Sequence, residues 1–237
     1  MKLLRITFSI VLLLSMNFIF KTKAQDWAKL SQFKEENSKV GLPRTNEDRV
    51  VFMGNSITIG WLKQAPQFFD NPNYINRGIG GQTTPQMLIR FRQDVLKLYP
   101  KVVIILAGTN DIAGNTGPST LEMIEDNLYS MAELAKANNI EVILCSVLPV
   151  YDYPWRKGLN PSEKIMELNS RIKEYADTHG IVYADYFSSM VDEQNGLKAE
   201  YTKDGVHPTQ AGYEVMAPIA EKAIARALVV WRENNKY

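Results

Sequence analysis

Cysteine and histidine are scarce in this sequence. The chain of 237 residues has one cysteine, Cys145, so no disulfide bond can form within it. Cys145 lies in the apolar run EVILCSVL, which is typical of a cysteine that is buried as a small hydrophobic residue. Only two histidines occur, His179 and His207, and the motif H-E-x-x-H is absent. A catalytic zinc site would have few ligands to draw on, so we expect no metal.

The sequence also lacks a large excess of either charge and lacks phosphate-binding motifs. It holds 27 Lys and Arg residues against 26 Asp and Glu residues, a net charge of +1. A nucleic-acid-binding surface would need a basic patch or stripe. There is no G-x-x-x-x-G-K-[ST], and in the stretch GIGGQT a G-x-G-x-x-G motif would need glycine at Thr83. We expect no nucleic-acid partner, no nucleotide and no cofactor.

The long apolar run at residues 6–20 follows Lys2 and Arg5 and precedes the small residues Thr22 and Ala24. This order is typical of a secretory signal, and we expect residues 1–24 to be cleaved off. An uncleaved membrane anchor is the alternative, but the run is shorter than the roughly 20 apolar residues that span a bilayer. Cleavage would leave 23 basic against 26 acidic residues, a net charge of −3. We expect an exported protein, periplasmic or extracellular, whose mature form has no integral membrane span.

The remaining residues, 25–237, suit one globular domain with one sizeable core. Five apolar runs end in small or polar residues: RVVFMGN, YINRGIGG, KVVIILAGTND, EVILCSVLP and GIVYADY. The longer helical patterns between and after them cover residues 85–99, 120–138, 161–179 and 209–234. Continuous apolar strands that are separated by helices predict a parallel sheet covered on both faces, the doubly wound α/β architecture. Ligands of such sheets bind outside the carboxyl ends of the strands.

Two shorter helices are expected as well. One follows Ser56. The other is predicted by the stretch DWAKLSQFKEEN, because Trp27, Leu30 and Phe33 are spaced three residues apart as on one face of a helix.

Ser56 follows Gly54 and Asn55 at a predicted turn from strand to helix, in the stretch GNSIT. At such a turn the hydroxyl projects over the sheet edge and the amide points from a helix N-terminus. Both properties suit a nucleophile that also stabilises an oxyanion. A plain N-cap is the alternative interpretation, because serine favours that position. The turn is not the G-x-S-x-G elbow of α/β-hydrolases, since position 58 is threonine.

Two further strand ends carry small or polar residues, in GIGGQT and AGTND. Gly78, Gly80 and Gly81 can let the backbone approach a substrate and leave an amide free to donate, or they can form only a tight turn. Asn110 can turn its side-chain amide towards an oxyanion or form a local turn, and Asp111 can cap the turn that follows.

The two histidines differ in their surroundings. His179 lies at the end of a predicted helix, where the helix dipole favours a cation, and a structural role is sufficient for it. His207 lies in DGVHP, three residues after Asp204, and a turn there can bring the carboxylate to one ring nitrogen. A serine hydroxyl needs a neutral imidazole within about 3 Å, and the imidazole needs an acceptor that fixes its tautomer. Asp204 and His207 can supply both to Ser56.

The stretches GNSIT, NRGIGGQT, AGTND and DGVHP, in this order, resemble the four signature blocks of the SGNH hydrolases, also called GDSL-type esterases and lipases. The resemblance covers residues 49–212. It implies a three-layer α/β/α, flavodoxin-like fold with a five-stranded parallel sheet, and ester hydrolysis without a metal. The roles that it implies are Ser56 as nucleophile, His207 as base, Asp204 as the partner of His207, and the Ser56 amide, the Gly81 amide and the Asn110 side chain as the oxyanion hole.

The sequence departs from that family at one position. The first block of the family usually reads Gly-Asp-Ser, and here Asn55 replaces the aspartate. This aspartate is not the triad carboxylate, so the implied chemistry should survive. The replacement bears on the hydrogen bonds that hold the turn.

The segment of residues 151–161, YDYPWRKGLNP, should overhang the site after the fourth strand. Tyr151, Tyr153 and Trp155 could stack on a sugar ring or wall an acyl pocket, and Arg156 could meet an anionic group. Alternatively, the aromatic residues only anchor the loop by packing. Residues 113–119 are small and polar and offer no long apolar channel, which disfavours a true lipase.

Exported members of the resembled family often remove acetyl groups from carbohydrates, so we expect a small-molecule or glycan ester as substrate and carbohydrate O-acetylesterase activity. One alternative is a short-chain acyl esterase or lysophospholipase-type lipase. Another is a catalytically silent carbohydrate-binding domain, although binding alone would not require the triad.

Overall fold

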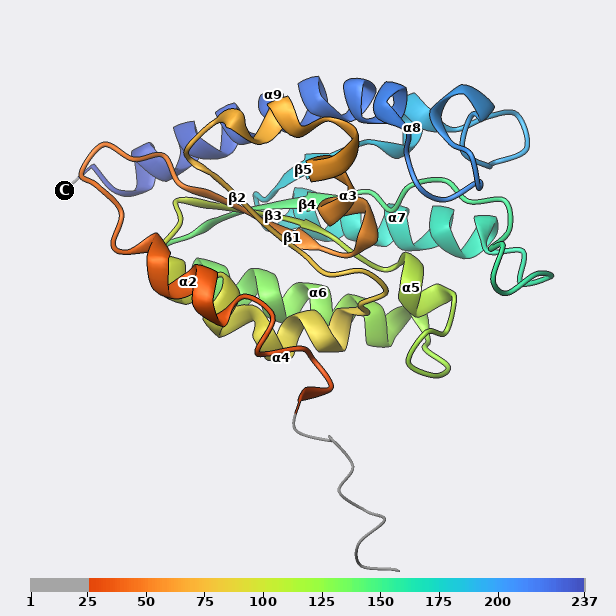
Figure 1. The fold of residues 1–237 in the computed structure, drawn as a ribbon, viewed down its shortest axis with the longest axis horizontal. Coiled ribbons are helices and arrows are strands. Elements are labelled where there is room, and N and C mark those ends of the chain that lie inside the picture. The colour runs from red at the N-terminus through yellow and green to blue at the C-terminus, as the bar shows by residue number, and fades with distance from the viewer. Residues whose placement is uncertain (1–25, 237) are drawn as a thin grey trace, which may run out of the picture.

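The five apolar runs form five strands of one sheet (Figure 1). A computed structural model describes residues 26–236, and the expected signal segment lies outside them. The strands are β1 (Val50–Gly54), β2 (Tyr74–Gly78), β3 (Val102–Leu106), β4 (Glu141–Cys145) and β5 (Val182–Ala184). Neighbouring strands pair in parallel, in the order β2-β1-β3-β4-β5. This is the strand order of flavodoxin-like sheets, and the predicted α/β fold is confirmed.

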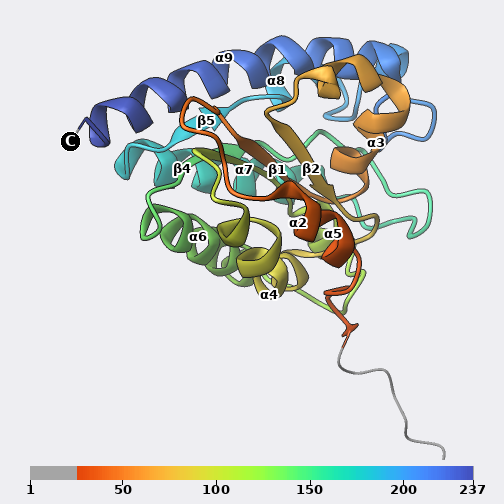
Figure 2. The same cartoon turned by 60° about the vertical axis from the view of Figure 1, so that its left-hand side comes forward.

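Helices cover both faces of the sheet, which gives three layers (Figures 1 and 2). One face carries α4 (Thr84–Asp94), α6 (Leu121–Lys136) and α7 (Ser162–Thr178), and the other carries α3 (Ser56–Gln64) and α9 (Gln210–Asn234). Successive side chains of a strand point to opposite faces. Val51 and Met53 of β1 therefore enter one apolar core, and Val50 and Phe52 enter the other.

The N-terminal helix begins later than the sequence predicts. Trp27 and Leu30 lie in turns, and α2 spans Lys34–Val40. The reason is tertiary: backbone carbonyls of the segment 27–30 accept hydrogen bonds from glutamine side chains on and just before α4 instead of from helix amides. The other short elements are α5 (Thr109–Ile112), α8 (Phe187–Met190) and the 3-10 helices η2 (Pro66–Asp70), η3 (Leu96–Leu98) and η4 (Ala199–Tyr201). No helix among residues 26–236 is long and apolar enough to span a membrane.

Glycines allow the ends of β1 and β2 to pack tightly against the start of α3. A Cβ atom at Gly78 would lie 2.9 Å from both the carbonyl oxygen of Asn55 and Cα of Ile59. A Cβ atom at Gly54 would lie 2.9 Å from the carbonyl oxygen of Leu106. Real Cβ atoms are not found so close to backbone atoms, so both positions require glycine. The turn that carries Ser56 is held against the sheet by this close approach.

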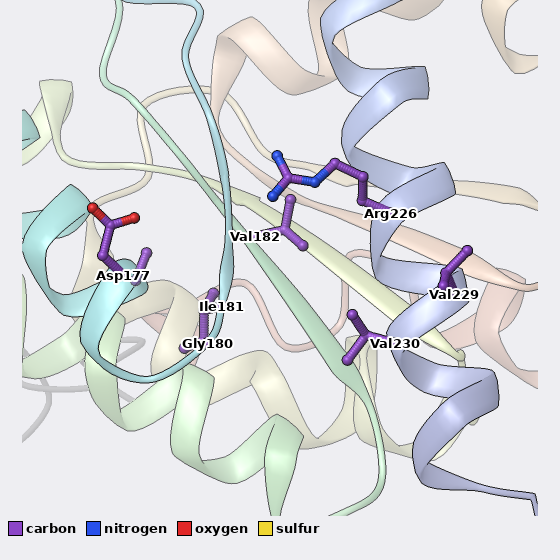
Figure 3. A pocket seen from close by; sticks show the side chains of 8 residues that line it. Asp177, Gly180, Ile181, Val182, Arg226, Val229 and Val230 are labelled. Carbon is purple, nitrogen blue, oxygen red and sulfur yellow. The ribbon is translucent and has the colours of Figure 1, made fainter.

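A groove of about 490 Å³ lies between the end of α7 and α9, beside the start of β5 (Figure 3). Its lining includes Asp177 from α7, Ile181 before the strand, and Arg226 from α9. It opens near the amino end of β5, whereas ligands of open α/β sheets bind outside the carboxyl ends. The candidate active site lies instead at the carboxyl ends of the strands.

Candidate active site

Ser56 is the first residue of α3 and follows β1 after one residue. The cap of this helix is Asn55, whose Oδ1 accepts a hydrogen bond from the amide of Ile57 at 2.9 Å. Asparagine therefore holds the turn at the position where the family usually has aspartate. The Nδ2 atom of Asn55 is buried, and none of residues 26–236 accepts a hydrogen bond from it. Because Asn55 caps the helix, the hydroxyl of Ser56 is left for another partner.

That partner is His207, which lies 151 residues further along the chain. The Oγ atom of Ser56 is 3.0 Å from Nε2 of His207, and Nδ1 of the same ring is 2.7 Å from Oδ2 of Asp204. When Nδ1–H donates to the carboxylate, the neutral ring has its lone pair on Nε2. The serine hydroxyl then donates to that nitrogen. The structure thus joins the three residues that the sequence predicts into one chain of hydrogen bonds.

Asp204 is oriented by its own loop. Its Oδ1 accepts hydrogen bonds from the amides of Val206 at 2.9 Å and His207 at 2.8 Å, and from the hydroxyl of Thr202 at 3.2 Å. Partial burial raises the pKa of the carboxyl, but hydrogen bonds from the amide and the ring of His207 outweigh it and lower the pKa to about 2. The carboxylate facing His207 is therefore ionised at neutral pH.

The other two residues predicted for the oxyanion hole lie in the segments that follow β2 and β3. Gly81 is exposed and has a φ of 76°, in the region that favours glycine, so the turn after β2 requires it. Asn110 is buried in α5, and its Nδ2 donates to the backbone oxygen of Gln82 at 2.9 Å. Asn115 adds a second link, because its Nδ2 donates to the backbone oxygen of Gly81 at 3.3 Å. The loops after β2 and β3 are thereby tied together beside the serine turn.

Asp111 caps a different segment from the one that the sequence suggests. Its carboxylate accepts hydrogen bonds from the amide and the hydroxyl of Thr84, at the start of α4. The side chain is 2% exposed, and burial raises its pKa to about 6 in spite of these hydrogen bonds. Sequence reasoning missed this contact, because its partner lies 27 residues away.

His179 and Cys145 take the structural positions that the sequence predicts. His179 is the C-cap of α7, and its Nδ1 is 2.8 Å from the backbone oxygen of Tyr175. Cys145 is 2% exposed in β4, and burial raises the pKa of its thiol. Within residues 26–236, no three His, Cys, Asp or Glu side chains are grouped as a metal site would require.

The segment after β4 presents some of its aromatic residues and buries others. Trp155 is 47% exposed, and its ring centroid lies 6.2 Å from that of His207. Tyr151 is 58% exposed. Tyr153 is fully buried and its hydroxyl donates to the backbone oxygen of Thr109 at 2.9 Å. Packing therefore accounts for Tyr153, whereas a role of Tyr151 and Trp155 in substrate binding stays a prediction.

Arg156 connects this segment to the loop after α5. Its Nη1 donates to the backbone oxygens of Ala113 at 2.7 Å and Gly114 at 3.1 Å. The side chain thus fixes two loops near the site relative to each other. A further role in binding an anionic group stays a prediction.

Comparison with known proteins identifies the class. The model of the GDSL-like lipase/acylhydrolase family matches residues 52–215, so the chain belongs to that family. A crystal structure of a Bacteroides fragilis protein is similar to this fold with a TM-score of 0.84 and 49% sequence identity. The match covers 86% of this chain and 99% of that one.

Curated relatives are more distant. An acetylxylan esterase of Xylanibacter ruminicola is 26% identical over 222 residues, which cover 77% of this chain and 45% of that protein. The human platelet-activating factor acetylhydrolase IB subunit alpha2 is 24% identical over 187 residues, which cover 75% of this chain and 77% of that subunit. The chain spans less than half the length of the three bacterial relatives that it matches, the acetylxylan esterase among them.

Proposed function

We propose that this protein hydrolyses carboxylic esters with Ser56 as nucleophile, His207 as base and Asp204 as the group that orients the base. The observation that carries the proposal is the unbroken series of contacts, 3.0 Å from serine to imidazole and 2.7 Å from imidazole to carboxylate. A binding domain has no need of a serine hydroxyl aligned with a base. Membership of the GDSL-like lipase/acylhydrolase family supports the same class of reaction.

In the proposed mechanism, Nε2 of His207 takes the proton of Ser56 as Oγ bonds to the ester carbonyl carbon. The carbonyl electron pair moves onto its oxygen, and three donors stabilise that charge: the amides of Ser56 and Gly81 and the Nδ2 of Asn110. When the intermediate collapses, the bond to the alcohol oxygen breaks and His207 gives that oxygen the proton. The acyl group is then bound to the serine.

Water completes the cycle by the same steps. It attacks the acyl carbon and gives a proton to His207, which returns it to the oxygen of Ser56 as the carboxylic acid leaves. Asp204 stays ionised throughout and stabilises the imidazolium form of His207. No metal or cofactor takes part in these steps.

For the substrate, we propose an O-acetylated carbohydrate. The exposed ring of Trp155 offers a flat apolar face beside His207, which suits a sugar ring, and Tyr151 of the same segment is exposed as well. Similarity to the acetylxylan esterase of Xylanibacter ruminicola supports the same class of substrate. A short-chain or lysolipid ester is the second candidate, favoured by the platelet-activating factor acetylhydrolase relative.

The test is acetate release by residues 25–237 from acetylated xylan, acetylated pectin, O-acetylated sialic acid and a short-chain lysolipid, with Ser56→Ala as control. Serine-dependent release from one glycan supports the proposal and names the substrate. Activity confined to the lysolipid supports the second candidate.

A silent binding domain is distinguished by covalent labelling. A fluorophosphonate reacts with an activated serine and not with an ordinary one, so the wild type should be labelled and Ser56→Ala should not. Folded wild-type protein that resists labelling would point to the binding domain.

We also propose that the chain is exported and that residues 25–237 form a single domain after cleavage behind Ala24. The pattern of residues 1–24 carries this proposal. N-terminal sequencing of the protein recovered from the producing cell should begin at Gln25. Recovery of an intact N-terminus in the membrane fraction would point to the uncleaved anchor.

A further inference from the structure

Gln82 directly follows Gly81 of the proposed oxyanion hole, is 1% exposed, and uses both polar ends of its side chain. Its Nε2 donates to the backbone oxygen of Ala28 at 2.7 Å, and its Oε1 accepts from Nε of Arg90 at 2.5 Å. The backbone oxygen of Gln82 accepts from the Nδ2 of Asn110 at 2.9 Å. One residue thus joins the N-terminal segment, α4 and α5.

Arg90 fixes Gln82 relative to the sheet. The guanidinium is fully buried, and its Nη2 donates to the backbone oxygens of Gly54 at 3.2 Å and Arg77 at 2.8 Å, near the carboxyl ends of β1 and β2. Its Nη1 pairs with Asp94 at 3.0 Å, so the buried charge is compensated. A guanidinium presents its donors in a rigid planar fork. The position of Gln82 is therefore tied to the strand that ends at the Ser56 turn.

We propose that Gln82 is a positioning residue that aims the side-chain amide of Asn110 at the oxyanion, an inference that rests on the proposed esterase function. The two hydrogens of a primary amide lie in one plane. When one N–H of Asn110 donates to Gln82, the direction of the other is set. A donor that is already oriented needs no reorganisation during the reaction, and a misplacement of about 1 Å can cost on the order of 10² in rate.

Gln93 provides a matched control. Its Nε2 donates to the backbone oxygen of Leu30 at 2.6 Å, so it fastens the same N-terminal segment as Gln82 does. Its backbone oxygen accepts from the Nδ2 of Asn37, which also lies on the N-terminal side. Gln93 lies on α4, eleven residues beyond Gln82 in the chain, and the contacts described for it lead away from Asn110.

The test compares Gln82→Met and Gln93→Met in the protein of residues 25–237, using p-nitrophenyl acetate. Both variants lose a side-chain hydrogen bond to the N-terminal segment, so both should melt at a lower temperature than the wild type. Only Gln82→Met should lose activity, with kcat about 10- to 100-fold lower and KM changed by less than about threefold. A kcat for Gln82→Met within about twofold of that for Gln93→Met overturns the proposal. If the methionine variant does not fold, Gln82→Glu, which keeps the acceptor for Arg90, takes its place in every measurement.

A double-mutant cycle asks whether Gln82 acts through Asn110. In the Asn110→Ala background the amide is gone, so the Gln82 substitution should reduce kcat by less than about threefold. If the reduction in kcat of the double variant equals the product of the reductions of the two single variants, the proposal is overturned. Activity that survives in Ser56→Ala would remove the proposed function and the positioning role with it. Serine-dependent activity with equal kcat in the two glutamine variants would remove the positioning role alone.

Discussion

The carboxylate of Asp111 accepts hydrogen bonds from the amide of Thr84 at 2.9 Å and from its hydroxyl at 2.6 Å. This contact joins α5, which carries Asn110, to the first turn of α4. Two hydrogen bonds do not offset the cost of burying the charge, so the pKa of Asp111 is raised to about 6. The same residue therefore holds the site together and makes its stability depend on pH.

The first prediction concerns that pH dependence. The folded protein holds the Asp111 proton more tightly than the unfolded chain, so the free energy of unfolding falls as pH rises from about 4 to about 6 and does not fall further from this cause. Asp111→Asn removes the titration. The difference in free energy of unfolding between wild type and variant should shift by on the order of 3 kcal/mol between pH 4 and pH 7, in favour of the variant at pH 7. Urea denaturation at the two pH values measures it, and an unchanged difference would show that the pKa is not raised.

The second prediction concerns the oxyanion hole. Asn110→Ala should lower kcat by on the order of 10² to 10³, because it removes one of the three proposed donors to the developing charge. Asn115→Ala is the control: Asn115 is exposed and only supports the backbone oxygen of Gly81, so its loss should change kcat by less than about fivefold. Steady-state kinetics on a p-nitrophenyl ester compares the two. Full activity in folded Asn110→Ala would remove that side chain from the hole.

The third prediction concerns the orientation of His207. In Asp204→Asn, the amide can present a donor to Nδ1, which then favours the wrong tautomer of the ring. We expect kcat to fall by on the order of 10³ to 10⁴, with the fold retained. The pKa of Asp204 is about 2, so its protonation cannot account for a loss of wild-type activity between pH 4 and pH 7. A variant that keeps a tenth of wild-type kcat would show that another group orients the histidine.

The fourth prediction concerns the exposed indole beside His207. Trp155→Ala should raise KM for an acetylated polysaccharide by about 3- to 10-fold, since stacking is lost, and leave p-nitrophenyl acetate kinetics nearly unchanged. Tyr99→Ala removes a similarly exposed ring just before β3, at the amino edge of the sheet, and should change neither. Equal effects of Trp155→Ala on both substrates would assign the indole to the site's structure and not to glycan binding.

The strands and the residues of the four blocks could be predicted from the sequence, because both are local patterns. Continuous apolar runs define buried parallel strands. The carboxyl ends of parallel strands lie at one edge of the sheet, so the polar residues at these ends lie there together. The resemblance to a known family added the three-layer, five-stranded form of the α/β fold and the proposed roles of Gly81 and Asn110.

Contacts between distant segments could not be predicted in the same way. Nothing near Gln82 in the sequence indicates that its side chain reaches Ala28, 54 residues earlier. The same contacts explain the error at the N-terminus, where the spacing of Trp27 and Leu30 suggested a helix. Glutamine side chains donate to backbone carbonyls that would otherwise accept hydrogen bonds from helix amides. Tertiary structure therefore overrides the local pattern.

The fifth prediction concerns Gly78 and Gly80, which are separated by a single residue in the stretch GIGG. Gly78→Ala would place Cβ 2.9 Å from Asn55 O and Ile59 Cα, backbone atoms that can move only with the turn that carries Ser56. We expect a loss of about 1–3 kcal/mol in the free energy of unfolding, together with reduced activity, because relief of the clash displaces the serine. Gly80→Ala is the control, since a Cβ there meets no atom within 4 Å and the backbone is not in the left-handed region. Chemical denaturation and ester kinetics on both variants test this. Equal stability of the two would mean that α3 can move away from β2 without cost, and the tight packing at Gly78 would then not be what holds Ser56 in place.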